Sequence, residues 1–134
     1  MLRRNTPVRA VDTNVIVRLL EQDDPGQAAT AEAFLKAGGP VWVSHLILAE
    51  TVWVLEDVYQ RTKREILDAL DALMDNQVIH IQGQEIVKAA VEAFRDCKAD
   101  FSDCLALEIA RAHGHLPLAT FDKAFAKLRD VDRL

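Results

Sequence analysis

The sequence contains few cysteines and histidines, the residues that stabilise small domains through disulfide bonds or bound zinc. It has two cysteines, Cys97 and Cys104, among its 134 residues. Two thiols form neither a disulfide framework nor, alone, a zinc site, and none of the four histidines stands at a zinc-like spacing from them. We therefore expect both cysteines to be reduced and to face mostly into the core.

Long apolar runs and an excess of basic charge are also missing. No stretch approaches the ~20 residues that a membrane-spanning helix needs, and Met1–Pro7 contains no apolar signal-peptide core. We accordingly expect a cytoplasmic protein with no membrane segment. With 16 basic and 21 acidic residues, the net charge of −5 argues against nucleic-acid binding by a simple positive surface. A nuclease is not excluded, because bound cations can invert the charge of a site.

The composition that remains is that of one globular domain. Half of the residues are hydrophobic and 28% are charged, a balance that is typical of folded proteins and not of disordered ones. A chain of 134 residues can bury a core of its own without staples. We expect a single domain over residues 1–134.

Short apolar runs alternate with helical periodicity along the chain. Runs of branched residues predict strands over residues 8–11, 41–43, 78–81 and 116–120. Apolar spacing and turn residues predict helices over residues 14–21, 27–37, 45–59, 62–75, 84–97, 102–113 and 122–128. Either Ser102 or Asp103 is the expected cap of the sixth helix. This alternation predicts an α/β fold, with a parallel sheet covered by helices on both faces.

Acidic residues recur at the ends of the predicted strands and at the starts of helices. Asp12 ends the first strand, Asp122 follows the last, and Asp100 and Asp103 lie where the preceding helix begins. Ligands of open parallel sheets bind beyond the carboxyl ends of the strands. Each aspartate alone also suits the ordinary role of a helix cap, but together they repel one another unless a cation neutralises them. Ligands that are all oxygen suit Mg²⁺ or Mn²⁺ better than zinc.

Glu50 stands in a stretch that is otherwise apolar nearly all round. Such a pattern predicts a buried helix, with Trp53 in the core like Trp42 of the preceding strand. A buried carboxylate requires a partner or a metal, and no cation stands three or four residues away from Glu50. The alternative is that Glu50 lies on a narrow exposed stripe with His45 and Asp57.

In these acidic positions and their neighbours, the chain resembles the PIN-domain ribonucleases, in particular the VapC-type toxins of bacterial type II toxin–antitoxin pairs. Any one motif is weak, but four occur in order and at family-like spacing across residues 8–128. They are Val11-Asp12-Thr13-Asn14-Val15 with Arg18, Leu48-Ala49-Glu50-Thr51 with Val54-Leu55, Ala99-Asp100-Phe101-Ser102-Asp103-Cys104-Leu105, and Ala119-Thr120-Phe121-Asp122-Lys123-Ala124-Phe125. Cys104 departs from the family, in which an alanine-like residue is usual.

The resemblance implies a fold, an activity and partners. The fold is a PIN-like three-layer α/β/α sandwich whose central, mainly parallel sheet has four or five short strands. The activity is Mg²⁺- or Mn²⁺-dependent endonucleolytic hydrolysis of RNA, with tRNA, rRNA or mRNA as the substrate. The partners are a cognate VapB-type antitoxin, which blocks the acidic groove, and a second copy of the chain in a homodimer.

The resemblance also assigns roles to individual residues. Asp100 matches a frequent extra acidic residue and is an implied fifth metal ligand. From its charge and its place about a turn and a half after Asp12, Arg18 is a candidate contact to RNA phosphate, and a solvated helix residue is the equal alternative. Three polar neighbours would orient carboxylates or waters, namely Thr13, Asn14 and Thr120. Four carboxylates match the quartet that is catalytic and binds the metal, namely Asp12, Glu50, Asp103 and Asp122.

Two other functions stay open from the sequence. The first is a different metal-dependent α/β phosphohydrolase, although an aspartyl-phosphate enzyme of the haloacid-dehalogenase type expects a carboxylate where Asn14 stands. The second is a non-catalytic PIN-like binding module that keeps its acidic pocket for structure or partner recognition. Idle buried carboxylates would then carry an electrostatic penalty without a use.

Overall fold

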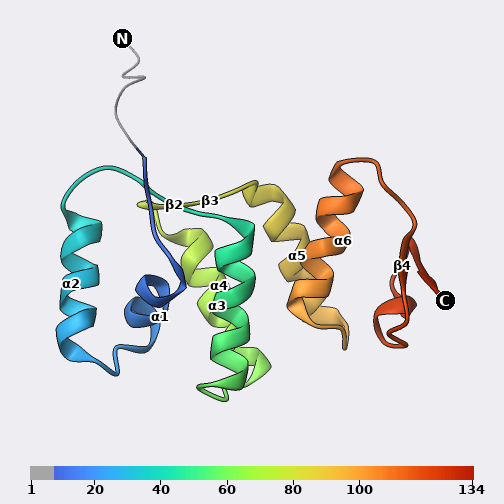
Figure 1. Cartoon of the computed structure of the whole chain (residues 1–134), viewed down its shortest axis with the longest axis horizontal. Coiled ribbons are helices and arrows are strands. Elements are labelled where there is room, and N and C mark those ends of the chain that lie inside the picture. The colour runs from blue at the N-terminus through green and yellow to red at the C-terminus, as the bar shows by residue number, and fades with distance from the viewer. Residues whose placement is uncertain (1–7) are drawn as a thin grey trace, which may run out of the picture. The chain divides into compact units, whose positions relative to one another are not determined.

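The computed structural model describes residues 8–134, which divide into two compact units at Gln82 and Gly83. Residues 1–7, in which we expect no export sequence, lie outside the described part. Each unit has its own helices and its own parallel strands (Figure 1). Within residues 8–134, every helix is too short or too polar to cross a bilayer.

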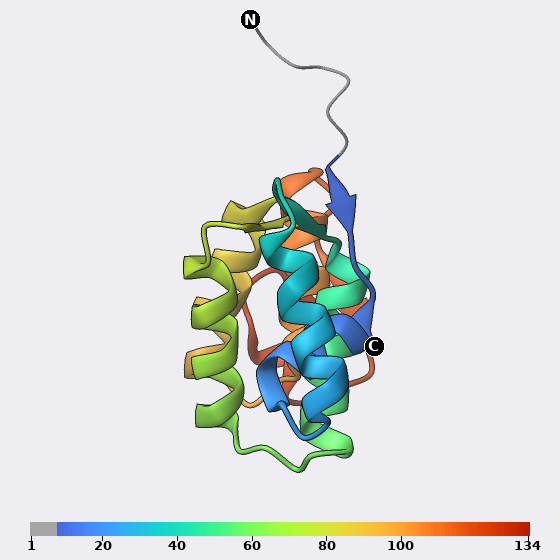
Figure 2. The same cartoon turned by 90° about the vertical axis from the view of Figure 1, so that its left-hand side faces the viewer.

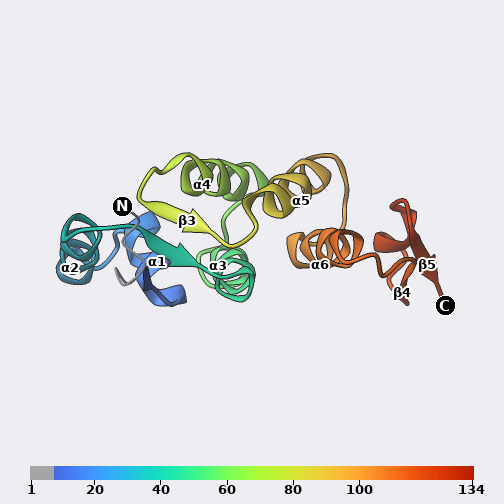
Figure 3. The same cartoon turned by 90° about the horizontal axis from the view of Figure 1, so that it is seen from above.

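The first unit contains a three-stranded parallel sheet and four helices. The strands are β1 (Arg9–Ala10), β2 (Val41–Val43) and β3 (Ile79–Ile81), and β2 pairs with both of the others. The helices are α1 (Thr13–Glu21), α2 (Pro25–Lys36), α3 (His45–Asp57) and α4 (Lys63–Asp75). Figure 2 shows α1 beside α2, and Figure 3 shows β2 beside β3.

Side-chain caps begin all four of these helices. In each case an oxygen accepts the backbone N–H three residues further on, which satisfies a donor that has no partner inside the helix. Thr62 also forms a capping box with Glu65. The capping residues are Asp12, Asp24, Ser44 and Thr62. The sequence thus places the start of each helix locally, including the start of α1 at the predicted site.

The core of the first unit is built from the apolar faces of α1, α3 and α4 and from the strands. Branched side chains alternate with exposed ones in β2 and β3, so each strand buries its first and third residues. The buried members include Ile16, Val17, Val41, Val43, Leu48, Val52, Ile66, Leu70, Ile79 and Ile81. Burial of this apolar surface stabilises the unit that positions Asp12 and Glu50.

The second unit consists of a helix pair followed by a pair of parallel strands. Its elements are α5 (Gln84–Asp96), α6 (Phe101–Ala112), β4 (Leu118–Thr120), the 3₁₀ turn η1 (Phe125–Lys127) and β5 (Val131–Arg133). The rings of Phe94 and Phe101 meet edge to face at 5.8 Å between centroids, which fixes α5 against α6. Gly114 ends α6 with a φ of +73°, as its position just after the helix predicts.

The α/β class and the parallel pairing of the strands are confirmed. Within residues 8–134, five strands form two sheets, with three strands in the first unit and two in the second. The sequence pattern does not predict β5, and it predicts a longer last helix than η1, the part that forms. A strand of three residues between charged neighbours carries too little periodicity to be recognised.

The predicted cap of α6 is wrong. The helix begins at Phe101, and Asp100 occupies the position before it with an extended backbone. Phe101 is fully buried against Phe94. This contact draws the start of the helix toward the core and leaves Asp103 inside the first turn, where an acidic residue interacts favourably with the helix dipole.

The two tryptophans are also not where the sequence predicts. Trp42 is 39% exposed and Trp53 is 58% exposed. The helix α3 is apolar over more of its circumference than the core of the first unit covers.

The cysteines follow their expected placement more closely. Cys104 is buried, Cys97 is half-buried, and their sulfur atoms lie 3.6 Å apart without a disulfide bond.

Candidate active site

Asp12 lies between β1 and the first turn of α1. Its Oδ1 accepts the backbone N–H of Val15 at 3.2 Å, and the side chain is exposed. One carboxylate oxygen therefore caps the helix, and the other is directed away from this bond. Asp12 serves the capping role that its position alone predicts, and it keeps an oxygen for a ligand.

Glu50 is tied to the same part of the first unit by a hydrogen bond. The buried hydroxyl of Thr13, the residue after Asp12, donates to Oε1 of Glu50. The bond joins residues 37 positions apart and fixes the carboxylate of α3 next to the start of α1. Thr13 thus orients a carboxylate, which is the kind of role that the family resemblance implies for it.

The expected burial of Glu50 is wrong. The side chain is exposed, and it shares the outer side of α3 with Leu46 and Trp53, at spacings of four and three residues. The opposite side of the helix is buried through Leu48 and Val52. A helix that is apolar nearly all round hides which face the core covers, so the pattern could not decide the burial of Glu50.

In the second unit, three aspartates act on one another. Burial raises the pKa of the Asp103 carboxyl above its ordinary value, and the charges of Asp100 and Asp122 raise it further. Asp100 and Asp103 come from the start of α6, whereas Asp122 follows β4. The fold therefore gathers negative charge from two separate elements, and a cation placed here would relieve the repulsion.

A short turn holds Asp122 in place after β4. The hydroxyl of Thr120 accepts the backbone N–H of Asp122 at 3.0 Å. In turn, Oδ1 of Asp122 accepts the backbone N–H of Phe125 at 2.9 Å, at the start of η1. Asp122 therefore resembles Asp12 in its local geometry, because one oxygen caps a helical turn and the side chain stays exposed. The hydroxyl of Thr120 contacts the backbone of Asp122 and not its carboxylate, so its role in orienting that carboxylate stays a prediction.

Two more of the predicted residues lie on α1 after Thr13. Asn14 is exposed in the first turn, and Arg18 is half-buried one turn later. The guanidinium of Arg18 donates to Oε1 of Gln27 at 2.5 Å and to the hydroxyl of Tyr59 at 3.2 Å, and it lies 3.6 Å from a carboxylate oxygen of Asp23. These contacts join α1 to α2 and to the end of α3. Gln27, Tyr59 and Asp23 are residues that the sequence analysis missed, because no local pattern links positions so far apart in the chain.

A comparison with protein families matches the PIN domain to residues 9–131. The matched range starts in β1, ends at the first residue of β5 and includes every acidic residue described above. The chain belongs to the PIN-domain family.

Two further comparisons were made with this PIN domain. No curated protein matches it. Among solved structures, it is similar to the VapC20 toxin of Mycobacterium tuberculosis, which cleaves the sarcin-ricin loop. The two chains are 20% identical, the match covers 88% of this chain and 92% of that one, and the TM-score is 0.43.

The acidic residues of the PIN domain are divided between the two units. Asp12 and Glu50 belong to the first unit, and Asp100, Asp103 and Asp122 belong to the second. Over residues 8–134, no group of three or more histidine, cysteine, aspartate or glutamate side chains is arranged so that it could hold a metal ion. The common site of all five therefore stays a prediction. Each unit nevertheless holds a set of oxygen ligands of the kind that Mg²⁺ and Mn²⁺ prefer.

Proposed function

We propose that this PIN domain is an endoribonuclease that depends on Mg²⁺ or Mn²⁺. The observation that carries the proposal is the acidic cluster around Asp103, where burial and, after it, the charges of Asp100 and Asp122 raise the pKa of the half-buried carboxyl. Such an arrangement is unfavourable in the free protein and becomes favourable when a divalent cation binds. Membership of the PIN-domain family supports the same activity.

The donor set fits the ion. The proposed ligands are the carboxylates of Asp12, Glu50, Asp103 and Asp122, with Asp100 beside them. They are hard oxygen donors, which magnesium and manganese prefer over zinc. A bound ion of this kind lowers the pKa of water and stabilises charge on phosphoryl oxygens.

Hydrogen bonds within each unit hold individual members of this proposed set. Thr13 holds Glu50 through its hydroxyl, and Thr120 holds the turn that carries Asp122. Capping bonds leave one oxygen each on Asp12 and Asp122 for other contacts. Asn14 is exposed beside Asp12 and is proposed to orient water or substrate there. Arg18 is proposed to contact RNA, although its guanidinium is already held by Gln27 and Tyr59.

We also propose that the chain acts as a VapC-type toxin in the cytoplasm, with a VapB-type antitoxin as its partner. The four sequence segments that resemble this group support the assignment. A homodimer is the proposed assembly, and its support is the exposed apolar side of α3. On that helix and just after it, Leu46 is 75% exposed, Trp53 58% and Val58 64%. Apolar side chains gathered on one helix favour association with another chain.

The test of the proposed activity is the appearance of new RNA ends. The purified chain is incubated with total RNA and Mn²⁺ or Mg²⁺, and the ends of the products are sequenced. We expect new internal ends at a limited number of positions, no new ends in excess chelator, and recovery when Mn²⁺ is restored. Ends that persist in chelator would contradict metal dependence, and the absence of any cleavage would favour a non-catalytic binding module.

A substitution at Thr13 tests how Glu50 is held. Thr13→Val keeps the buried shape but removes the hydroxyl that donates to Glu50. We expect the Mn²⁺ concentration for half-maximal RNA cleavage to rise roughly ten- to a hundredfold, the usual effect of losing a group that orients a metal ligand. Thr13→Ser retains the hydroxyl and is the matched control. Equal manganese dependence for the valine and serine variants would show that the bond has no role in metal binding.

A further inference from the structure

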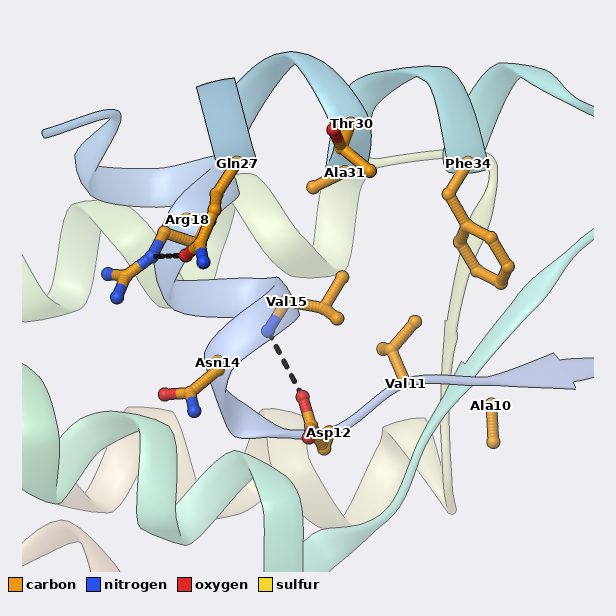
Figure 4. Close-up of a pocket in the computed structure, with 10 residues that line it drawn as sticks. All are labelled: Ala10, Val11, Asp12, Asn14, Val15, Arg18, Gln27, Thr30, Ala31 and Phe34. Carbon is orange, nitrogen blue, oxygen red and sulfur yellow. Dashed lines mark hydrogen bonds between the residues drawn. The ribbon is translucent and has the colours of Figure 1, made fainter. Parts of the chain in front are cut away.

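A pocket of about 640 Å³ opens in the first unit, between the start of α1 and one face of α2. Figure 4 shows its lining, with Val11, Asp12 and Val15 on one side and Ala31 and Phe34 on the other. The volume is in the usual range of pockets that bind small molecules. Asp12, a proposed metal ligand, is part of its wall.

The apolar part of the pocket is held rigidly around Phe34. The guanidinium of Arg9 lies 4.2 Å from the centroid of the Phe34 ring and donates hydrogen bonds to the carbonyl oxygens of Phe34 and Gly39. These contacts join β1 to the end of α2. The ring, together with Val11, Val15 and Ala31, provides a fixed surface for a flat apolar group.

The charges in the pocket favour a neutral ligand. Among the described residues that line it, the one cation is Arg18, which is paired with Asp23 and donates to Gln27 and Tyr59. The one anion among these lining residues, Asp12, repels phosphate. A phosphate group is therefore disfavoured inside the pocket, whereas an uncharged ring is not.

Two polar groups at the rim can recognise the edge of such a ring. Because Arg18 only donates hydrogen bonds, the oxygen of the Gln27 amide faces it, and the amide N–H groups are left to point elsewhere. The hydroxyl of Thr30 donates to the carbonyl oxygen of Gly26 at 3.0 Å, so its lone pairs can accept. The lining thus includes a side chain with free donors, Gln27, and one with a free acceptor, Thr30.

We propose that this pocket binds the base of the RNA nucleotide next to the bond that is cut. The inference rests on the proposed function, because it is Asp12 that joins the pocket to the metal site. A base is neutral, flat and apolar on its faces, with hydrogen-bonding groups on its edge, and its own phosphate would lie outside, toward the metal ligands. The donors of Gln27 favour an edge rich in acceptors, such as O6 and N7 of guanine.

Binding is tested without cleavage by titrating the isotope-labelled chain with the four nucleoside 5′-monophosphates in the absence of divalent metal. We expect NMR shifts of the amides of Val11, Val15 and Ala31, with the guanosine nucleotide bound most tightly. Thr30→Trp fills the mouth of the pocket and should abolish these shifts. Ala29→Trp adds the same ring to α2 at an exposed position outside the lining and should retain them. Shifts that are absent, or that lie elsewhere, would overturn the proposal.

RNA cleavage by the same variants connects the pocket to the cut bond. For Thr30→Trp we expect KM to rise about tenfold with little change in kcat, as loss of one stacked base predicts. Gln27→Glu replaces donors with acceptors of nearly the same shape and should change which base borders the cut. If both variants cut RNA at the same positions and with the same KM as the wild type, the base-binding proposal is overturned, whereas the proposed endoribonuclease activity is not.

Two other outcomes separate the pocket from the activity. If nucleotides bind in the pocket but the wild type cleaves no RNA with either metal, the proposed function is wrong, and the role beside a cut bond is overturned with it. If the pocket amides respond to a co-purified protein partner and to none of the nucleotides, the occupant is a protein side chain and the base-binding proposal is overturned.

Discussion

Asp12→Asn is expected to lower metal-dependent RNA cleavage roughly a hundredfold or more. Loss of a residue that orients a metal ligand usually costs about ten- to a hundredfold, and loss of the ligand itself should cost more. The substitution removes one negative charge and one strong oxygen donor from the proposed site. It preserves the helix, since asparagine caps as well as aspartate and Oδ1 of either residue can accept the N–H of Val15. Cleavage is measured on a defined RNA at saturating Mn²⁺, and folding is measured by thermal unfolding.

The first unit contains a matched control for this variant. Asp24 caps α2 in the same way, accepting the N–H of Gln27 at 3.0 Å, and it is not a proposed ligand. Asp24→Asn should leave both the unfolding temperature and the cleavage rate at wild-type values. Cleavage by Asp12→Asn at the rate of Asp24→Asn would remove Asp12 from the metal site and, with it, the main support for the mechanism.

Asp103→Asn is expected to reduce cleavage by a similar factor, roughly a hundredfold, and at the same time to stabilise the metal-free protein. Burial and the charges of Asp100 and Asp122 raise the pKa of Asp103 in the folded chain. The ionised carboxylate is therefore less favourable in the folded state than in the unfolded state at neutral pH. Removing its charge relieves this cost, so the melting temperature without metal should increase.

The stability difference between Asp103→Asn and the wild type should depend on pH and on metal. Because the folded pKa lies above the unfolded one, protonation of Asp103 favours folding, and that contribution is lost as pH rises through the folded pKa. The gap in stability between Asp103→Asn and the wild type should therefore narrow in acid. Mn²⁺ should raise the melting temperature of the wild type and have less effect on the variant.

Melting curves across pH, with and without Mn²⁺, measure these effects. Asp132→Asn in β5 is the control, since it removes an exposed aspartate of the second unit that is not a proposed ligand. A metal-free Asp103→Asn protein that melts below the wild type at neutral pH would contradict the repulsion. A gain in stability without any loss of cleavage would show that the acidic cluster exists but does not serve the reaction.

Some features of the site could be predicted because they depend on neighbours in the chain. Asp12 caps α1, and Asp122 accepts the backbone N–H of Phe125, in each case from a residue three positions further on, and such bonds follow from residue type and order. Gly114 ends α6 for an equally local reason. The starts of α1 to α4 are correct to within two residues on the same basis.

Other features could not be predicted, because they depend on contacts between distant segments. The start of α6 is set by the packing of Phe101 against Phe94, which overrides the capping preference of Ser102. The exposure of Glu50 depends on which side of α3 meets the core, and an apolar helix does not encode that choice in its periodicity. The pairing of β5 with β4 adds a strand too short to be seen alone.

The sequence by itself determined the α/β class, the starts of the helices of the first unit to within two residues, and the acidic positions in which the chain resembles the PIN-domain family. All three depend on residue type and on short spacings along the chain. Only the tertiary structure decided that Thr13 holds Glu50, that burial and the charges of Asp100 and Asp122 raise the pKa of Asp103, and that a pocket lies beside Asp12. Hydrogen bonds, charge repulsion and cavities act over a few ångströms of space, and folding alone brings the participating residues that close.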